Sequence, residues 1–216
     1  AYITRDGCGL RTACGDASAC QVACTADDAC AGYTGTLSPK INAGIVAWGK
    51  ENMGGSGAPT TGTYVSLFSN LRAFVAMKAD GSITSWGYSI SGGNNAPTDN
   101  GYVNIISNNW AFAAIKADGS ISTWGQSNEG GSGAPTDAGY VNIFSTDYAF
   151  AALSSTGSIT TWGHPTYGKD GAPTTGEYKN IVASVNAFAA IPHETSYAYG
   201  PEELASFAST TTNYAG

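Results

Sequence analysis

The sequence predicts an all-β repeat protein, and two observations predict it. The first is the period. Trp-Gly recurs every 38 residues, at Trp48, Trp86, Trp124 and Trp162, and two other landmarks keep the same phase: Ala-Pro-Thr from Ala58, Ala96, Ala134 and Ala172, and Ala-Phe from Ala73, Ala111, Ala149 and Ala187. A fixed period near 40 residues is typical of architectures in which each unit buries its apolar face against its neighbours. The second is the alternation of short β-branched and aromatic segments between these landmarks.

Each unit is expected to contain three strands. In the third full unit they cover residues 140–146, 149–154 and 158–162. Tight hairpin turns join the second and third strands, since Asp80-Gly81, Asp118-Gly119 and Thr156-Gly157 stand between them and Gly or Asp readily takes positive φ there. The alanines of residues 111–114 suit an inner strand with close neighbours, and the large side chains are then expected to fill the space between units.

The stretch after each Trp-Gly is rich in glycine, as in residues 128–135. This composition predicts a crossing loop or a short edge strand that leads into the next unit.

Four units are clear, and both ends of the array are unfinished. The units span residues 49–86, 87–124, 125–162 and 163–199, the last ending in Tyr199-Gly200 after a one-residue deletion. A weak half-unit precedes them, with Tyr33–Leu37 standing for a middle strand and Gly44–Trp48 for a third strand. We therefore expect a repeat domain over 33–200 and a polar tail over 201–216, in which residues 206–212 are able to supply a missing strand to this molecule or to a neighbour.

Residues 1–32 form a separate cysteine-rich segment. All five cysteines lie there: Cys8, Cys14, Cys20, Cys24 and Cys30. Such confinement predicts a small disulfide module from an oxidising compartment, and the odd number leaves one cysteine free, bonded to another chain, or paired outside this sequence. The spacing lacks the C-x2-C pairs of zinc sites. A helix over residues 17–30 would place Cys20 and Cys24 on one face.

Composition narrows the function further. The net charge is −7 without a basic cluster, which argues against nucleic acid or an anionic membrane as the main partner, and no apolar run is long enough to span a bilayer. Only 12% of residues are charged, about half the usual share. Together with the cysteines and the start at Ala1 without Met, this favours a processed, extracellular protein or a fragment of one.

Two resemblances follow from these residues. The unit at residues 102–125 resembles the blade of the regulator-of-chromosome-condensation β-propellers, above all the short-blade type II β-lactamase inhibitory proteins, and the likeness covers residues 44–200. It implies a propeller-type array of four to five blades, although that family has about seven and carries Gly-Gln where this chain has Gly92-Gly93 and Gly130-Gly131. Residues 17–34 resemble PAN/apple modules, which implies a Cys24–Cys30 pair and a bond from Cys20 to Cys8 or Cys14.

The candidate binding residues are those that vary while the rest of the unit stays constant. They precede each Ala-Phe and are Arg72, Trp110, Tyr148 and Asn186. In the inhibitory relatives the matching loops carry aromatic residues that contact the target protein, so the resemblance implies a binding role for Trp110 and Tyr148; the alternative is that they only cover the hairpin end. A second variable set follows each Trp-Gly: Lys50, Tyr88, Gln126 and His164.

No catalytic residue, metal site or cofactor is expected. His164 and His193 are the only histidines, no Ser/His/Asp set or carboxylate pair stands in a recognisable setting, and the Asp-Gly turns lack the terminal Glu of a calcium loop. The first hypothesis is a non-enzymatic extracellular structural protein that self-assembles, as a filament or surface layer, through its ends and its cysteine-rich N-terminus. The alternative is a closed β-propeller that binds a protein or glycan through its variable loops.

Overall fold

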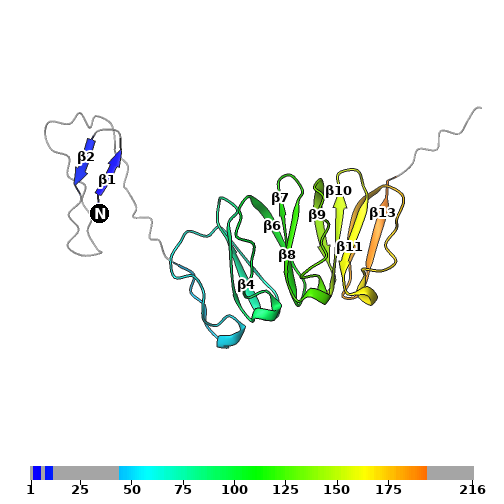
Figure 1. The fold of residues 1–216 in the computed structure, drawn as a ribbon, viewed down its shortest axis with the longest axis horizontal. Helices are drawn as coiled ribbons and strands as arrows, with labels where there is room; N and C mark the ends of the chain where they lie inside the picture. Colours follow the sequence, from blue (N-terminus) through cyan, green and yellow to red (C-terminus); the bar gives the residue numbers. More distant parts are fainter. Residues whose placement is uncertain (1, 6–7, 12–43, 194–216) are drawn as a thin grey trace, which may run out of the picture. The chain divides into compact units, whose positions relative to one another are not determined.

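The computed structural model describes residues 2–5, 8–11 and 44–193 (Figure 1). The chain divides into two units, Ala1–Ile41 and Asn42–Gly216. In the first unit, β1 (Tyr2–Arg5) pairs antiparallel with β2 (Cys8–Arg11). The predicted helix, the half-unit strand at Tyr33–Leu37, four of the five cysteines and the tail lie outside the described residues, so the disulfides and the boundaries 1–32, 33–200 and 201–216 stay predictions.

Four antiparallel sheets follow one another along the second unit, and we call them blades I to IV (Figure 1). Blade I holds β3 (Ser66–Ser69), β4 (Ala73–Met77) and β5 (Ile83–Gly87). Blade II holds β6 (Tyr102–Ser107), β7 (Ala111–Lys116) and β8 (Ile121–Gly125). Blade III holds β9 (Tyr140–Ser145), β10 (Ala149–Ser154) and β11 (Ile159–Gly163). Blade IV holds β12 (Tyr178–Ala183) and β13 (Phe188–Pro192). The predicted all-β blade array is confirmed.

The middle strand of each complete blade is the alanine-rich one, as predicted. In blade III, β10 lies between β9 and β11, and its residues Ala149–Leu153 are all buried. The small side chains leave room for the neighbouring blades to pack against both faces of the sheet.

The hairpin turns are those that the sequence predicts. In blade II, Asp118 Oδ1 accepts hydrogen bonds from the Ser120 backbone N–H at 2.9 Å and from the Ser120 hydroxyl at 2.7 Å. Gly119 has φ +82°, and a Cβ there would lie 2.3 Å from the backbone nitrogen of Tyr140. The turn therefore needs glycine for its backbone angle and for its contact with the start of the neighbouring strand.

The glycine-rich stretch after each Trp-Gly is a loop with one 3₁₀ turn. The four turns are η1 (Glu51–Met53), η2 (Ser89–Ser91), η3 (Ser127–Glu129) and η4 (Pro165–Tyr167). The short edge strand that the sequence also allowed does not form in residues 44–193.

The third strand of each complete blade fixes that blade to the loop before it. Trp162 is 2% exposed, stacks on Phe150 with ring centroids 5.4 Å apart, and donates its Nε1–H to the Gly130 carbonyl at 3.2 Å. The same arrangement recurs around Trp86 and Trp124. The repeated tryptophan is therefore a structural residue, because it fills the core between blades and its one polar group is satisfied.

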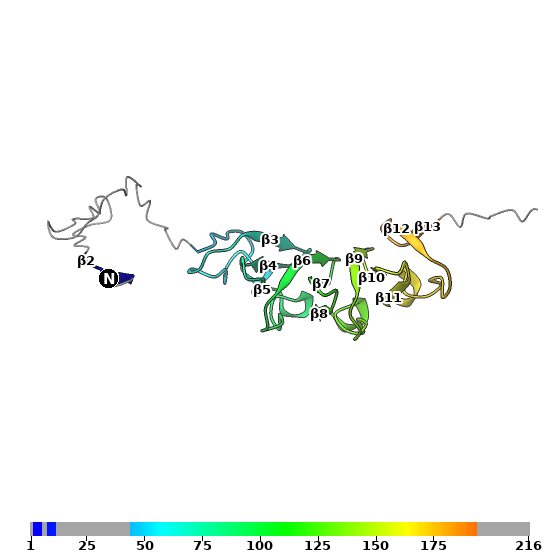
Figure 2. The ribbon, with the colours of Figure 1, turned by 90° about the horizontal axis from the view of Figure 1, so that it is seen from above.

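The row of blades is open. Figures 1 and 2 show blade I and blade IV at opposite ends of it. In blade IV, β13 pairs only with β12 among the described strands. At the other end, Gly44–Trp48 forms no strand, contrary to the prediction, because no described strand lies beside it, and Trp48 is 84% exposed.

Candidate binding edge

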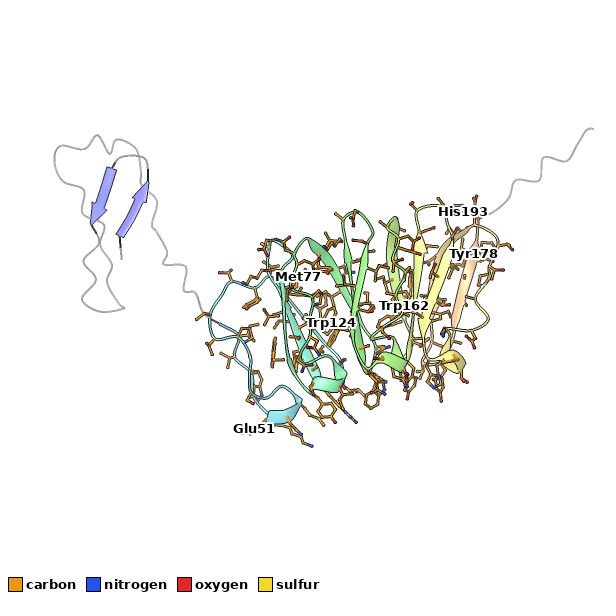
Figure 3. The ribbon with its side chains drawn as sticks, in the orientation of Figure 1. Glu51, Met77, Trp124, Trp162, Tyr178 and His193 are labelled. Carbon is orange, nitrogen blue, oxygen red and sulfur yellow. The ribbon has the colours of Figure 1, made fainter. Side chains whose placement is uncertain are left out.

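The variable residues lie along one edge of the blade row. Tyr88 N–H donates to the Arg72 carbonyl at 2.8 Å, and the corresponding bonds join Gln126 to Trp110 and His164 to Tyr148. Each bond ties a 3₁₀ loop to the turn between the first and second strands of a blade. Both predicted sets of variable residues therefore lie on the edge where Figure 3 labels Glu51, and Met77 and His193 lie on the opposite edge.

A polar side chain two residues before each variable residue holds its turn. Asn108 is 5% exposed; its Oδ1 accepts hydrogen bonds from the backbone N–H groups of Trp110 and Ala111 at 2.8 and 2.7 Å, and its Nδ2 donates to the Glu129 carbonyl at 2.6 Å. Asn70 and Thr146 do the same in their blades. A role for this position was not predicted, although an Asn, Thr or Ser stands there in every unit. It makes the backbone of the variable turns rigid.

Neighbouring turns are also joined to one another. Asn109 N–H donates to the Asp147 carbonyl at 3.2 Å, and Asp147 N–H donates to the Val185 carbonyl at 2.9 Å. The turns of blades II, III and IV thus form a continuous backbone ridge along this edge.

Arg72 joins the side chains of two blades. Its guanidinium carbon lies 4.4 Å from the centroid of the Trp110 ring and 5.5 Å from that of Tyr88. A cation over an aromatic face is attracted by the ring quadrupole, and the flat guanidinium stacks well. All three side chains are half-buried.

A second group lies around Tyr148. The ring of Tyr148 is 4.6 Å from that of Tyr167 and 6.4 Å from that of His164. His164 Nδ1 accepts a hydrogen bond from the backbone N–H of Thr166 at 3.3 Å. Tyr167 was not predicted, because only a single unit carries an aromatic residue at that place. We call these six side chains the aromatic edge: Arg72, Tyr88, Trp110, Tyr148, His164 and Tyr167.

The fourth predicted residue, Asn186, stands apart from these rings. It is exposed and lines a cavity beside Phe188 at the open end of blade IV. Lys50 lies at the start of η1 and Gln126 at the start of η3, so both share the edge without a described ring contact.

On the opposite edge, an ion pair and a hydrogen bond hold a loop against blade II. Lys116 Nζ lies 2.5 Å from Asp99 Oδ2, and the Tyr102 hydroxyl donates to Asp99 Oδ1 at 2.8 Å. The hydrogen bond from Lys116, with that from Tyr102, lowers the pKa of Asp99, while burial raises the pKa of Tyr102. These bonds tie the loop before β6 to the end of β7.

The two histidines lie far apart in the blade row. His164 lies at the start of η4, bonded to the turn before β10, whereas His193 lies on the opposite edge (Figure 3). Within residues 44–193 no three His, Cys, Asp or Glu side chains gather as metal ligands would. The described part of the chain also has no helix of the length and apolarity that a membrane crossing needs.

The fold is similar to that of solved β-propeller proteins. The ectodomain of the receptor kinase CR4 from Physcomitrella patens matches with a TM-score of 0.52 and 20% identity, over 68% of this chain and 43% of that one. The CRINKLY WD40 ectodomain of the Arabidopsis thaliana receptor kinase ACR4 has a TM-score of 0.47 at 17% identity, covering 61% of this chain and 46% of that one. Prp20p from Saccharomyces cerevisiae, described with binding properties to Gsp1p and histones, has a TM-score of 0.42 at 14% identity, covering 62% and 45%.

Of these three structures, the CR4 ectodomain alone has a TM-score above 0.5, and at 20% identity the similarity is one of fold. The chain spans less than half the length of the ectodomains that it matches. No family model matches the chain, and no curated protein matches its sequence. The narrower resemblance to the inhibitory proteins stays a prediction.

Proposed function

We propose that this chain is a propeller-type binding module that recognises a protein partner through its aromatic edge. The observation that carries the proposal is the position of Trp110 and Tyr148. Both variable aromatic residues lie on one edge, each in contact with further variable side chains, above turns that buried Asn and Thr residues fix. The framework is constant from blade to blade while these side chains change, as in a scaffold that carries specificity in its loops.

The residue types favour a protein over other partners. Trp, Tyr and Arg are the residues that most often dominate protein interfaces, since each covers a large area and loses little conformational entropy when its neighbours already hold it. On this edge Arg72 lies over Trp110, and Tyr148 lies against Tyr167, before any partner arrives. A glycan that stacks on the same rings is the competing ligand.

The test uses defined probes, because the partner is unidentified. A random peptide library displayed on phage is selected against the full chain, and the enriched peptides are synthesised and titrated. Trp110→Ala and Tyr148→Ala should each weaken binding about 30-fold, the loss of about 2 kcal/mol that marks an anchor residue. Val103→Ala, an exposed apolar change on the edge strand β6, is the control and should bind unchanged.

Three results would speak against a protein partner at this edge. The library enriches no peptide; the enriched peptides bind both variants as well as the wild type; or a glycan array yields a ligand sensitive to Trp110→Ala while the peptides do not.

A self-assembling structural role is the second candidate, and a different observation favours it: the open row has a two-stranded blade IV at one end and an exposed Trp48 at the other. For both candidates we infer an extracellular, non-enzymatic protein. The clustered cysteines and low charge support the location, and the placement of His164 at η4, away from His193, supports the absence of acid–base chemistry.

A further inference from the structure

The open end of blade IV contains a cavity of about 220 Å³. Its lining includes Ile159 from β11 of blade III, Gly168 and Ala172 from the loop between the blades, and Phe188 and Ala190 from β13. The cavity therefore lies between the last two blades, beside the edge of β13 that no described strand covers.

The same place is filled by tryptophan in the three complete blades. Trp162 packs in a cluster with Phe150, Ile121 and Ala134, and it bonds to the carbonyl of Gly130. Residues 38 positions later line the cavity: Phe188, Ile159, Ala172 and Gly168. A Cβ on Gly168 would lie 2.6 Å from the Phe188 ring, and a Cβ on Gly130 lies equally close to Phe150, so the walls have the same form. The cavity therefore has the lining of the tryptophan sites in the complete blades but contains no tryptophan, and we call it the slot.

The other end of the row carries a Trp-Gly segment whose tryptophan, Trp48, is exposed. Residues 45–49 read Ile-Val-Ala-Trp-Gly and share the pattern Ile-x-x-Trp-Gly with β5, β8 and β11. Gly49 has φ +113°, the value of Gly87 and Gly125 in the complete blades. A Cβ on Gly49 would have no neighbour within 4 Å, whereas at Gly87 it would meet Ala73 of the paired strand. Gly49 therefore has the backbone angle of its counterparts in the complete blades, and no described strand lies against it.

We propose that residues 45–49 of one copy complete blade IV of a second copy, so that the chains join head to tail. The blade register predicts the joint. Leu153 pairs with Ile159 and Phe150 with Trp162 in blade III, so Ile191 is expected opposite Ile45 and Phe188 opposite Trp48 of the neighbouring copy. Added strands of this kind gain backbone hydrogen bonds along the edge and place alternate side chains in pockets. The inference deepens the second candidate function and rests on it.

A second copy fits the slot better than the segment that follows β13 in sequence. Residues 196–200 read Ser-Tyr-Ala-Tyr-Gly and keep neither the Ile nor the Trp of the pattern. The chain's own residues 45–49 lie at the opposite end of the row from its slot, as Figures 1 and 2 show. The joint also removes exposed apolar surface at both ends, since Trp48 is 84% and Ile191 47% exposed in the single chain.

Two variants, one at each end, test the joint by sedimentation velocity over a range of concentrations. Trp48→Ala removes the tryptophan that enters the slot and leaves the slot intact. Ala172→Trp fills the slot and leaves Trp48 intact. The wild type should grow into a concentration-dependent series of oligomers, each variant alone should stay monomeric, and an equimolar mixture should form a one-to-one dimer and nothing larger. Val141→Ala, an exposed apolar change in the middle of the row, should assemble like the wild type.

Circular dichroism checks the fold, and Ile191→Lys replaces Ala172→Trp if the latter unfolds. Non-reducing gels exclude cysteine cross-links as the cause of assembly. A wild type that stays monomeric at all concentrations overturns both the joint and the self-assembling function. Assembly that persists in Trp48→Ala, or a mixture that forms no dimer, overturns the joint alone.

Discussion

The buried Asn and Thr residues behind the variable turns explain how so varied an edge keeps one geometry. Asn108 satisfies two backbone N–H groups of its own turn and one carbonyl of the neighbouring loop. A buried polar group that loses its partner costs more than the bond itself contributes, so these side chains hold the turn firmly.

Asn108→Ala should therefore lower the free energy of unfolding by about 2 kcal/mol, because it leaves two donors and one acceptor without partners in a partly buried site. Urea titration followed by circular dichroism measures it, with the exposed change Val103→Ala as the reference. A loss as small as that of the reference would mean that water replaces the amide and that the turn does not depend on it.

Asp118 offers a pH test of the hairpin turn. Hydrogen bonds from the backbone and then the hydroxyl of Ser120 lower the pKa of Asp118 below its ordinary value of 3.8. A lowered folded-state pKa stabilises the turn above the unfolded-state value, and that stability is lost as pH falls through the folded-state value.

Ser120→Ala removes only the hydroxyl bond, so it should raise the pKa of Asp118 part of the way back toward 3.8. An NMR titration of the carboxyl carbons measures the shift, and Asp80, which accepts the same bonds from Ser82, serves as the internal reference. An unchanged Asp118 pKa would show that the hydroxyl bond does not form in solution.

At the scale of the strand and turn, the repeat pattern predicted most of the fold because its signals are local. Strand alternation, Asp-Gly turns and the alanine-rich middle strand each follow from a few neighbouring residues, and β9, β10 and β11 lie within one or two residues of the predicted ranges. The strand predicted at Gly44–Trp48 does not form, and the reason is non-local. Its own residues match the pattern, but a strand needs a partner, and Thr36 stands where the other units have the Phe that stacks on tryptophan.

Gly119 and Gly139 allow two effects of glycine to be compared: its access to positive φ, and the room it leaves for a neighbouring backbone. Gly119 has φ +82° and Gly139 has φ +94°, but only at Gly119 would a Cβ collide with a backbone, at 2.3 Å from Tyr140 N. Gly139→Ala should cost about 1 kcal/mol for the left-handed angle alone, and Gly119→Ala clearly more, since the strand must also move. Thermal unfolding of the two variants compares them, and equal losses would show that the close contact is relaxed in solution.

Across the whole molecule, the sequence predicted the unfinished ends but not which surfaces they create. Counting the 38-residue period gave five Trp-Gly or Tyr-Gly segments but only four clear first strands, with Tyr199-Gly200 ending the last unit. Only the packing of Phe188, Ala172 and Gly168 around a cavity shows that blade IV has a space where the complete blades hold tryptophan. The contact between Arg72 and Trp110 could not be predicted from the sequence either, because it depends on how two neighbouring blades are placed.

The aromatic edge and the two ends are separate surfaces, so binding and assembly can be tested independently in one set of proteins. The most direct measurement is calorimetric titration of a selected peptide into the Trp48→Ala chain and into the same chain with Trp110→Ala and Tyr148→Ala added. We expect wild-type affinity for the first and at least a 100-fold weaker Kd for the second, about 3 kcal/mol, because both anchors are lost. Equal affinity in the two proteins would overturn the proposed binding edge.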